Sequence, residues 1–411
     1  MAIENCPVEF VIRPKSEFLI IALQEGSGKF FVKRSYNTLF MQNHILLHAD
    51  VPGGDGGSMP PDSGSSAPTA ETGSGLSDDD KVAVDQLRGH YGKMKGELAK
   101  VIIGQDKVVD EMLMCILSRG HGLLMGVPGL AKTLMVNSLS KIMSLDFNRI
   151  QFTPDLMPSD ITGTEILQDG EAGRRQFEFV KGPIFANIIL ADEINRTPPK
   201  TQSALLEAMQ EHRVTTAGEH RALPQPFFVL ATQNPIEQEG TYPLPEAQLD
   251  RFMFLITVDY PTVDEERRIA RETTGTTAAQ LEEVIDGQAL QLYQSLVERV
   301  PVPDHVYDDV VEMVRMTRPK TDDAPEWVKK WVTWGSGPRA IQYLIRGAKA
   351  NAVLNGRYVV GWEDVESVAK PVLTHRILTN FQAQSEGVDS QFVITKLLEN
   401  IRDKEAALAG Q

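Results

Sequence analysis

A glycine-containing loop between a short apolar stretch and a helical pattern constrains this chain more than any other feature. The stretch 121–125 is followed by Gly126-Val-Pro-Gly129-Leu-Ala131-Lys132-Thr133, and a helical pattern then continues to Met143. Glycines let main-chain N–H groups turn toward an anion, and the amino end of a helix favours negative charge. The segment therefore predicts a phosphate-binding loop in an α/β fold, with Lys132 on the β- and γ-phosphate oxygens and Thr133 as a magnesium ligand.

One position departs from the strict form of this motif, in which glycine precedes the lysine. Ala131 stands there, and its Cβ adds bulk beside a bound phosphate. Taken alone, the loop is as compatible with an ordinary strand–turn–helix as with a nucleotide site. Its surroundings in the sequence therefore decide.

Polar side chains follow two further predicted strands. The very apolar strand 188–191 ends in Asp192 and Glu193, and the strand 227–231 leads into Asn234. At the carboxyl end of a parallel sheet, Asp192 is placed to hold Mg²⁺, and Glu193 to orient and deprotonate an attacking water. The Asn234 amide could position the same water. The alternatives are an exposed acidic strand end and a plain turn asparagine before proline.

Two arginines lie at positions where they could reach a phosphate. Arg251 precedes the last predicted strand, and Arg339 opens a helix in the sequence Gly337-Pro-Arg339-Ala340. Such arginines can stabilise charge on a γ-phosphate, either in the same subunit or from a neighbour. Each taken singly is equally typical of a surface ion pair.

The order of short apolar strands and helices predicts the domain organisation. Residues 81–261 read as an α/β domain whose parallel sheet is covered on both faces. The expected strands are 121–125, 148–152, 188–191, 227–231 and 253–258, and the expected helices include 132–143 and 201–211. After Pro261 the strands stop, and residues 262–411 read as an all-helical domain with segments at 262–273, 287–299, 304–317, 325–334, 338–354 and 362–378.

The first 80 residues have a different composition. Residues 51–80 are rich in glycine, serine, proline and acidic residues, which is typical of a flexible linker. Residues 1–50 contain β-like stretches at 8–14, 18–24 and 29–41 and are too few for a stable domain. We expect an N-terminal arm of uncertain structure, or an upstream stretch that precedes a start at Met59.

Charge and cysteine content narrow the class of protein. The formal net charge is −15, so the chain lacks the basic surface typical of a dedicated nucleic-acid-binding protein. The two cysteines, Cys6 and Cys115, share no disulfide or CxxC pattern. No apolar run is long enough for a signal peptide or a membrane span. We therefore expect a cytoplasmic protein.

In this order, the motifs GVPGLAKT, IILADE, ATQNP, LPEAQLDRF and GPRA resemble the AAA+ ATPases, and closely resemble the MoxR family, over about residues 81–380. The family shares alanine before the lysine, as do minichromosome maintenance helicases. The resemblance implies an AAA+ P-loop domain with a helical lid. Asp192 and Glu193 are then the Walker B pair, Asn234 is sensor 1, Arg251 an arginine finger acting on the next subunit and Arg339 sensor 2. The implied ATP-binding residues are Gly126, Val127, Pro128, Gly129, Leu130, Ala131, Lys132, Thr133 and Leu134, with Ile103 and Gly104 near the base.

The resemblance also implies a ring, most often a hexamer, that uses Mg²⁺-dependent ATP hydrolysis to mature or remodel a protein complex. Its expected partner carries a von Willebrand factor A domain, and its client is unknown. Predicted hairpins at 160–180 and 213–220 are similar to family insertions that press on clients, or are ordinary surface hairpins. Two alternatives stay open: a nucleic-acid motor, and a nucleotide-gated scaffold that hardly hydrolyses ATP.

Overall fold

The computed structural model describes residues 22–25, 29–32, 76–169, 175–216, 218–236, 240–273 and 280–409. The chain divides into two compact units, residues 1–69 and 70–411. In the first unit, β1 (Ala22–Glu25) pairs antiparallel with β2 (Lys29–Val32). β1 overlaps the predicted stretch 18–24 and extends one residue beyond it, and β2 lies within the stretch 29–41. The stretch 8–14 and residues 51–75 of the predicted linker lie outside the described residues.

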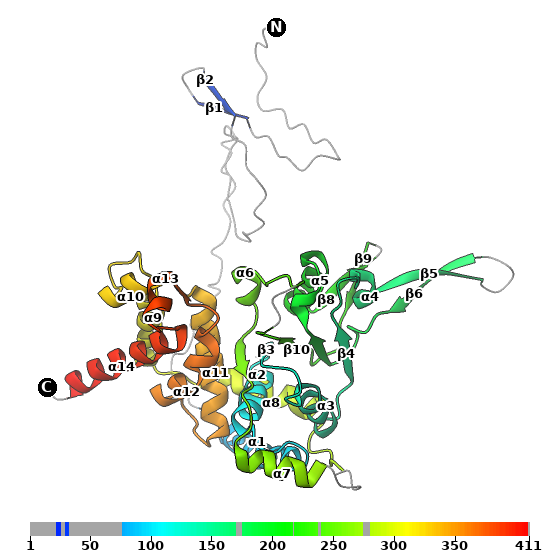
Figure 1. Cartoon of the computed structure of the whole chain (residues 1–411), viewed down its shortest axis with the longest axis horizontal. Helices are drawn as coiled ribbons and strands as arrows, with labels where there is room; N and C mark the ends of the chain where they lie inside the picture. The colour runs from blue at the N-terminus through cyan, green and yellow to red at the C-terminus, as the bar shows by residue number, and fades with distance from the viewer. Residues whose placement is uncertain are drawn as a thin grey trace, which may run out of the picture. The chain divides into compact units, whose positions relative to one another are not determined.

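A parallel five-stranded sheet forms the centre of the second unit (Figure 1). Its order is β11-β3-β10-β7-β4. The strands are β3 (Gly122–Met125), β4 (Phe147–Gln151), β7 (Ile188–Asp192), β10 (Phe228–Gln233) and β11 (Phe254–Thr257). Because every pair is parallel, all strands end at one side of the sheet, here called the carboxyl edge, and all begin at the other, the amino edge.

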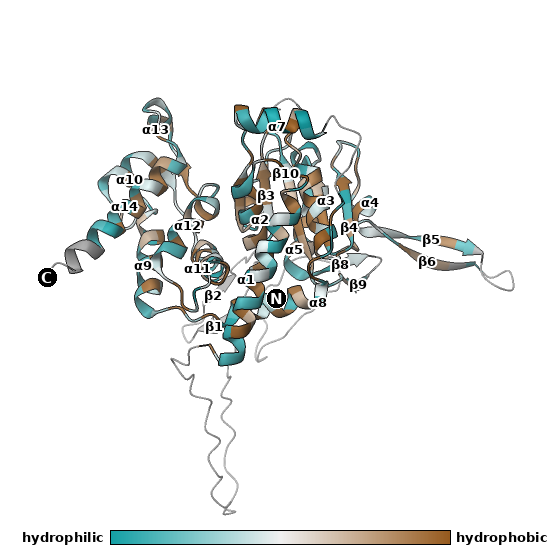
Figure 2. Cartoon of the chain, turned by 90° about the horizontal axis from the view of Figure 1, so that it is seen from below, coloured by the Kyte–Doolittle hydropathy of each residue, from teal (hydrophilic) through white to brown (hydrophobic). Residues whose placement is uncertain are grey.

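The two faces of the sheet pack against different helices, because side chains alternate along a strand. Leu124 and Leu230 belong to a core shared with α1 (Asp78–Leu98), α2 (Asp106–Leu117) and α3 (Lys132–Ile142). Leu123 and Val229 belong to a second core with α4 (Pro158–Thr162) and α5 (Pro199–Glu211). The apolar strands between these helices are brown in Figure 2. The predicted sheet covered on both faces is confirmed.

Two β-hairpins interrupt the α/β pattern, as the sequence predicts. β5 (Gly163–Asp169) pairs with β6 (Arg175–Lys181), and β8 (Arg213–Thr216) pairs with β9 (Glu219–Ala222). The β5–β6 ribbon extends away from the central sheet in both views (Figures 1 and 2). Its exposed apolar side chains include Leu167 and Phe177, which face each other across the two strands. Loops of this kind are available for contact with another molecule.

The C-terminal region is helical, with one exception. Its helices are α9 (Asp304–Met316), α10 (Glu326–Trp331), α11 (Pro338–Leu354), α12 (Trp362–Leu373), α13 (Phe381–Ser385) and α14 (Ser390–Ala409). The expectation that strands stop after Pro261 is wrong at one point, because β12 (Val332–Trp334) pairs antiparallel with β13 (Leu378–Thr379). β-branched and aromatic residues at 332–334 favour the extended backbone, so the predicted helix 325–334 ends at Trp331.

The segment between the sheet and this region holds α7 (Val263–Thr273) and α8 (Gly287–Arg299). Gln294 on α8 donates to the carbonyl oxygen of Ile116 at 2.8 Å, and Val284 N–H donates to that of Ile142 at 2.8 Å. α8 therefore packs on α2 and the end of α3. The predicted domain boundaries at 261 and 80 stay predictions, although α1 already begins at Asp78.

The helical region docks on the turn that precedes β11. The Arg376 side chain, 2% exposed, donates to the Asp250 carboxylate at 2.8 Å and to the Phe252 carbonyl oxygen at 2.6 Å. The Tyr343 hydroxyl donates to the carbonyl oxygen of Arg251 at 3.2 Å. Buried charge-assisted hydrogen bonds of this kind hold a backbone segment in one geometry. They fix the position from which the Arg251 side chain starts.

Candidate functional site

The predicted phosphate loop lies at the carboxyl edge, between β3 and α3. Gly129 and Ala131 both have a left-handed backbone, with φ of +87° and +56°. A Cβ built on Gly129 would have no atom within 4 Å, so the loop surface there is open. No side chain caps the amino end of α3. The first N–H groups of that helix are therefore directed at the space where an anion would bind.

The phosphate loop forms one wall of a cleft of about 460 Å³. The described residues that line this cleft are Pro128, Gly129, Leu130, Ala131, Lys132, Thr133, Leu134, Arg149, Asp192, Glu193, Thr232 and Asn234. The Lys132 ammonium group donates to the carbonyl oxygens of Gly126 and, at 2.9 Å, of Val127. Burial lowers the pKa of Lys132, while Asp192 and Glu193 oppose that shift. The Lys132 ammonium group thus lies in the loop that is predicted to bind phosphate.

Asp192 ends β7 and is held from two sides. The Thr232 hydroxyl donates to its Oδ1 at 2.6 Å, and Arg149 donates to its Oδ2 through Nη2 at 2.5 Å and Nε at 3.1 Å. Thr232 also accepts from the Glu193 N–H at 2.9 Å. Arg149 and Thr232 were given no role by the sequence analysis, although both lie next to predicted site residues.

Glu193 follows Asp192 in a left-handed conformation, with φ of +57°. Its Oε2 accepts from Gln151 Nε2 at 2.9 Å and is paired with Arg196 Nε at 3.1 Å. Gln151 Oε1 in turn accepts from Arg149 Nη2 at 2.6 Å. A non-glycine residue with positive φ costs free energy and is often found at functional sites. On β4, Arg149 therefore holds Asp192, and Gln151, two positions later, holds Glu193.

Asn234 lies at the same edge, after β10, and is 6% exposed. Its Oδ1 accepts from the Ile236 N–H at 3.1 Å, which is the local turn that an asparagine before proline commonly forms. The side chain also lines the cleft. Both interpretations of Asn234 thus describe part of its surroundings.

The residues of the cleft fit a magnesium ion bound together with a nucleotide. Mg²⁺ prefers oxygen ligands, and it commonly takes only one or two from the protein when phosphates supply others. The Asp192 carboxylate and the Thr133 hydroxyl both line the cleft. In the described part of the chain, no group of three His, Cys, Asp or Glu side chains is placed to hold a metal by itself.

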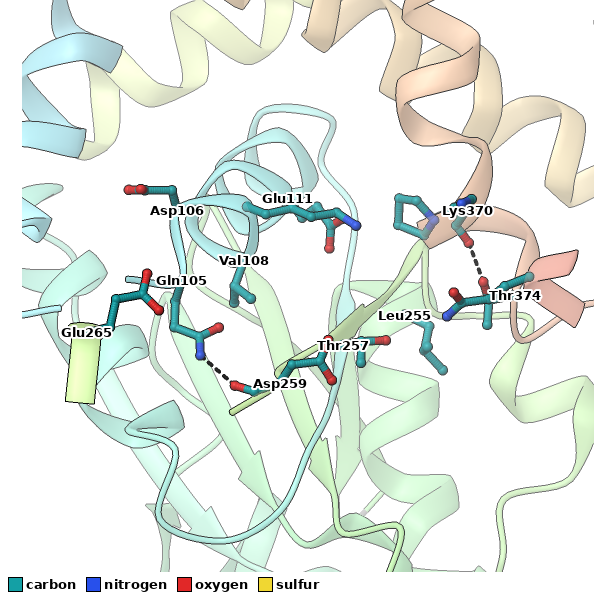
Figure 3. Close-up of a pocket in the computed structure, with 13 residues that line it drawn as sticks. Gln105, Asp106, Val108, Glu111, Leu255, Thr257, Asp259, Glu265, Lys370 and Thr374 are labelled. Atoms are coloured by element: carbon teal, nitrogen blue, oxygen red, sulfur yellow. Dashed lines mark hydrogen bonds and ion pairs between the residues drawn. The ribbon is translucent and has the colours of Figure 1, made fainter. Parts of the chain in front are cut away.

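Ile103 and Gly104 do not line this cleft. Gly104 has φ of +71°, a left-handed conformation that favours glycine, and it lies beside the Glu265 carboxylate of α7. The next residue, Gln105, lines a second cleft of about 340 Å³ between α2, β11 and α12 (Figure 3). Its side chain donates to the Asp259 carbonyl oxygen at 2.7 Å. The assignment of Ile103 and Gly104 to ATP binding stays a prediction.

Both predicted arginines lie at the amino edge, on the far side of the sheet from the phosphate loop. Arg251 and Arg339 line a pocket of about 210 Å³. Two further arginines, Arg119 and Arg346, line the same pocket, and the four are here called the arginine cluster. A four-residue strand such as β3 spans roughly 13 Å between the two edges. The structure therefore brings the arginines together, and it does not bring them to the phosphate loop of the same chain.

The contacts of Arg251 and Arg339 differ. Arg339 is paired with Asp250 at 3.1 Å, whereas Arg251 Nη1 donates to the Leu206 carbonyl oxygen at 3.0 Å. Burial lowers the pKa of Arg251, and the nearby charge of Arg339 lowers it further. Arginine stays charged in proteins, so this repulsion persists in the isolated chain.

Comparison with known proteins gives one consistent result. The model of the ATPase family associated with various cellular activities (AAA) matches residues 121–254, and the AAA lid domain matches residues 326–397. Chaperone MoxR1 of Mycobacterium tuberculosis is 41% identical over 350 residues, 85% of this chain and 91% of that protein. Protein MoxR of Paracoccus denitrificans is 31% identical over 318 residues, which cover 72% of this chain and 90% of that protein. The crystal structure of a candidate ATPase from Cytophaga hutchinsonii has a TM-score of 0.72 and 42% identity, and covers 78% of this chain and 96% of that one.

Proposed function

Because this chain belongs to the MoxR family of AAA+ ATPases, we propose that it hydrolyses ATP in a ring whose active sites are each completed by the next subunit. One observation carries this proposal: the phosphate loop and the acids lie at the carboxyl edge, whereas Arg251 and Arg339 lie at the amino edge. A head-to-tail contact between subunits would bring one edge against the other. A ring, with a hexamer as the expected size, is the closed form of such a contact.

In the proposed reaction, the chain's own residues bind the triphosphate and direct a water. Lys132 would exchange its contacts with the Gly126 and Val127 carbonyl oxygens for β- and γ-phosphate oxygens. Mg²⁺, held by Thr133 and Asp192, would neutralise phosphate charge when bound. Glu193 would orient the water that attacks the γ-phosphorus and accept its proton as the bond to the β-phosphate oxygen breaks, with Asn234 fixing the water's position.

Two features suggest how Glu193 is kept ready. Gln151 and Arg196 both bond its Oε2 and so fix the orientation of the carboxylate. Thr232 accepts from its main-chain N–H, so the backbone is held as well.

The assembly proposal is tested by mixing two inactive variants. Lys132→Ala should bind no ATP, and Arg251→Ala should bind ATP but turn it over about 10³-fold or more slowly, because the guanidinium stabilises transition-state charge. In a random equal mixture, about a quarter of interfaces join an intact phosphate loop to an intact Arg251 across a head-to-tail contact. ATPase activity should therefore return to about that fraction. Absence of any rescue would contradict action across subunits.

The remaining part of the proposal concerns what the ring acts on. We propose chaperone-like maturation or remodelling of a protein complex in the cytoplasm, with a von Willebrand factor A domain protein as partner. The relative named Chaperone MoxR1 supports this, and so does the β5–β6 ribbon with its exposed Leu167 and Phe177. In the described residues no helix has the length and apolarity to cross a membrane.

Affinity capture from cell lysate tests this part. Glu193→Gln in excess ATP should hold nucleotide and partner together, and Lys132→Ala is the matched control that binds neither. Mass spectrometry of proteins retained only by Glu193→Gln should identify a von Willebrand factor A domain protein with an enzyme complex. Retention of DNA or RNA together with replication or repair proteins would instead favour the nucleic-acid motor.

A further inference from the structure

Three side chains of α11 face the same pocket at the amino edge. Arg339, Tyr343 and Arg346 are spaced four and three residues apart, which places them on one face of a helix. All three line the pocket together with Arg251. The motif that identifies Arg339 ends before Arg346, so the sequence assigned Arg346 no role. The helix nevertheless presents both guanidinium groups to the same space.

The charges around this pocket are not balanced. Asp250 is shared by Arg339, at 3.1 Å, and by the buried Arg376, at 2.8 Å. Arg119 is paired with Glu298 at 3.2 Å. Arg251 is bonded to a main-chain oxygen only, and within the ranges that the structure describes Arg346 makes no side-chain hydrogen bond or ion pair. Among the residues that the structure describes, two of the four arginines thus have no carboxylate partner.

Arg346 is exposed and Arg251 is half-buried, so both guanidinium groups are accessible to an anion from outside. Arginine does not lose its proton at any physiological pH, unlike lysine or histidine in a similar position. The planar guanidinium offers two parallel N–H donors, which match phosphate oxygens. Two histidines also line the pocket. Burial lowers the pKa of His121 to about 4, and burial and Arg119 lower that of His212, so they add little positive charge at neutral pH. The unmatched charge therefore lies on Arg251 and Arg346.

We propose that Arg346 is a third guanidinium that contacts the γ-phosphate of the ATP bound in the next subunit, beside Arg251 and Arg339. This inference rests on the proposed function, because the phosphate comes from the neighbour's loop. Arg119 has a different part: its bonds to Glu298 and to Ser295, at 3.1 Å, hold it as a wall of the pocket. The other possible partner of Arg346 is a carboxylate of the neighbouring subunit, and the experiment separates the two.

The test compares assembly in ATP with assembly in ADP. Sedimentation velocity over a range of protein concentrations gives the assembly midpoint of the wild type, Arg346→Ala and Arg346→Lys in each nucleotide. Arg271→Ala is the matched control, since Arg271 is an exposed arginine of α7 outside the pocket. ATPase activity is measured on the same samples. A thermal unfolding scan checks the fold of each variant, and Arg346→Gln replaces the alanine variant if that variant unfolds.

A contact with the γ-phosphate predicts a specific pattern. Arg346→Ala should lower turnover about tenfold or more and weaken assembly in ATP by a similar factor, because a charge-assisted hydrogen bond is lost. Assembly in ADP should be unchanged, as should ATP binding to isolated subunits. Arg346→Lys should fall between the two, since it keeps the charge without the two parallel donors. The control should match the wild type.

Each other outcome overturns a defined statement. Equal weakening of assembly in ATP and ADP would show that the partner of Arg346 is present in both states, as a carboxylate of the neighbour would be, and the γ-phosphate contact would be wrong. Wild-type behaviour of Arg346→Ala, together with rescue in the mixture of Lys132→Ala and Arg251→Ala, would reject this inference alone. Absence of that rescue would reject the proposed function and this inference with it.

Discussion

The two edges of one sheet differ in how their charges are satisfied. At the carboxyl edge, Asp192 is paired with Arg149 and Glu193 with Arg196, so each acid has an arginine within the chain, and Lys132 donates to main-chain oxygens. At the amino edge, Arg251 and Arg346 line a pocket and, among the described residues, pair with no carboxylate. The carboxyl edge thus holds the acids that the chemistry needs together with one phosphate-binding lysine, whereas the amino edge presents arginines without acids. This difference is what a contact between the two edges of neighbouring subunits would use.

The largest expected effect comes from replacing the proposed general base at the carboxyl edge. Glu193→Gln should lower ATP turnover by about 10²- to 10⁴-fold, because an amide cannot accept the proton. ATP affinity, measured by isothermal titration calorimetry, should stay within about twofold, because the phosphate loop is intact. If turnover by the assembled wild type were no faster than by Glu193→Gln, the chain would be a nucleotide-gated scaffold and not a hydrolase.

Asp250 allows a sharper comparison, because it contacts both a buried arginine, Arg376, and a partly exposed one, Arg339. Arg376 is buried and holds the turn before β11, whereas Arg339 lies at the pocket. Arg376→Ala should lower the free energy of unfolding by about 3–5 kcal/mol, because it leaves buried acceptors unpaired. Arg339→Ala should lower it by less than about 1 kcal/mol, as for other partly exposed ion pairs. Denaturant titration measures both.

The two variants should also differ in an activity assay of mixtures. Arg339→Ala should fold normally and lose turnover, and its activity should return in part when it is mixed with Lys132→Ala. Arg376→Ala should lose activity through its unfolded fraction and through the loss of support for the turn that carries Arg251, and mixing with Lys132→Ala should not restore its stability. Equal loss of stability in the two variants would mean that Arg339 is a structural ion-pair partner, as one interpretation of the sequence allows.

How much the sequence could predict follows from the kind of signal. The phosphate loop, Asp192, Glu193 and Asn234 are each written into a strand end and the residues that follow it, so local pattern was enough to bring them to one edge. Arg149 and Gln151 were missed because they act across the sheet, from β4 onto the end of β7. No local pattern marks a side chain whose partner is more than forty positions away.

The arginine cluster shows the same limit at the other edge. Arg251 and Arg339 are parts of recognisable motifs, whereas Arg119 and Arg346 join them only because α11 packs beside the turn before β11. The strands β12 and β13 were missed for a different reason. Each has three residues or fewer, and such pairs form where the tertiary structure brings them together.

A buried glutamate differs from these arginines because it can become neutral by binding a proton. Glu111 on α2 is 5% exposed in the cleft of Figure 3, and its partner Lys107, at 3.7 Å, is largely exposed. Burial raises the pKa of Glu111 from 4.5 to about 7. The native state therefore favours the protonated form, and this contribution to stability is present below pH 4.5 and lost as pH rises through about 7.

Glu111→Gln removes that dependence. The variant should gain roughly 2–3 kcal/mol of unfolding free energy over the wild type at pH 8 and much less at pH 5, since each unit of pKa shift corresponds to 1.36 kcal/mol. Denaturant titrations at the two pH values measure the gain, and exposed Glu283→Gln is the control. A gain that does not change with pH would mean that Glu111 stays ionised, and that burial alone does not resolve unmatched charge in this protein.

The smallest expected effect concerns the backbone of the phosphate loop. Ala131 is held at φ of +56°, where alanine is disfavoured and glycine is not. Ala131→Gly should therefore raise the free energy of unfolding by about 0.5–1 kcal/mol, after the greater freedom of glycine in the unfolded chain is subtracted. Gly129→Ala, at φ of +87° in open space, is the matched opposite and should lower it by about 0.5–1 kcal/mol after the same subtraction. A loss of stability in Ala131→Gly would mean that its methyl group makes a contact that outweighs this strain, and that the carboxyl edge is held by packing as well as by matched charges.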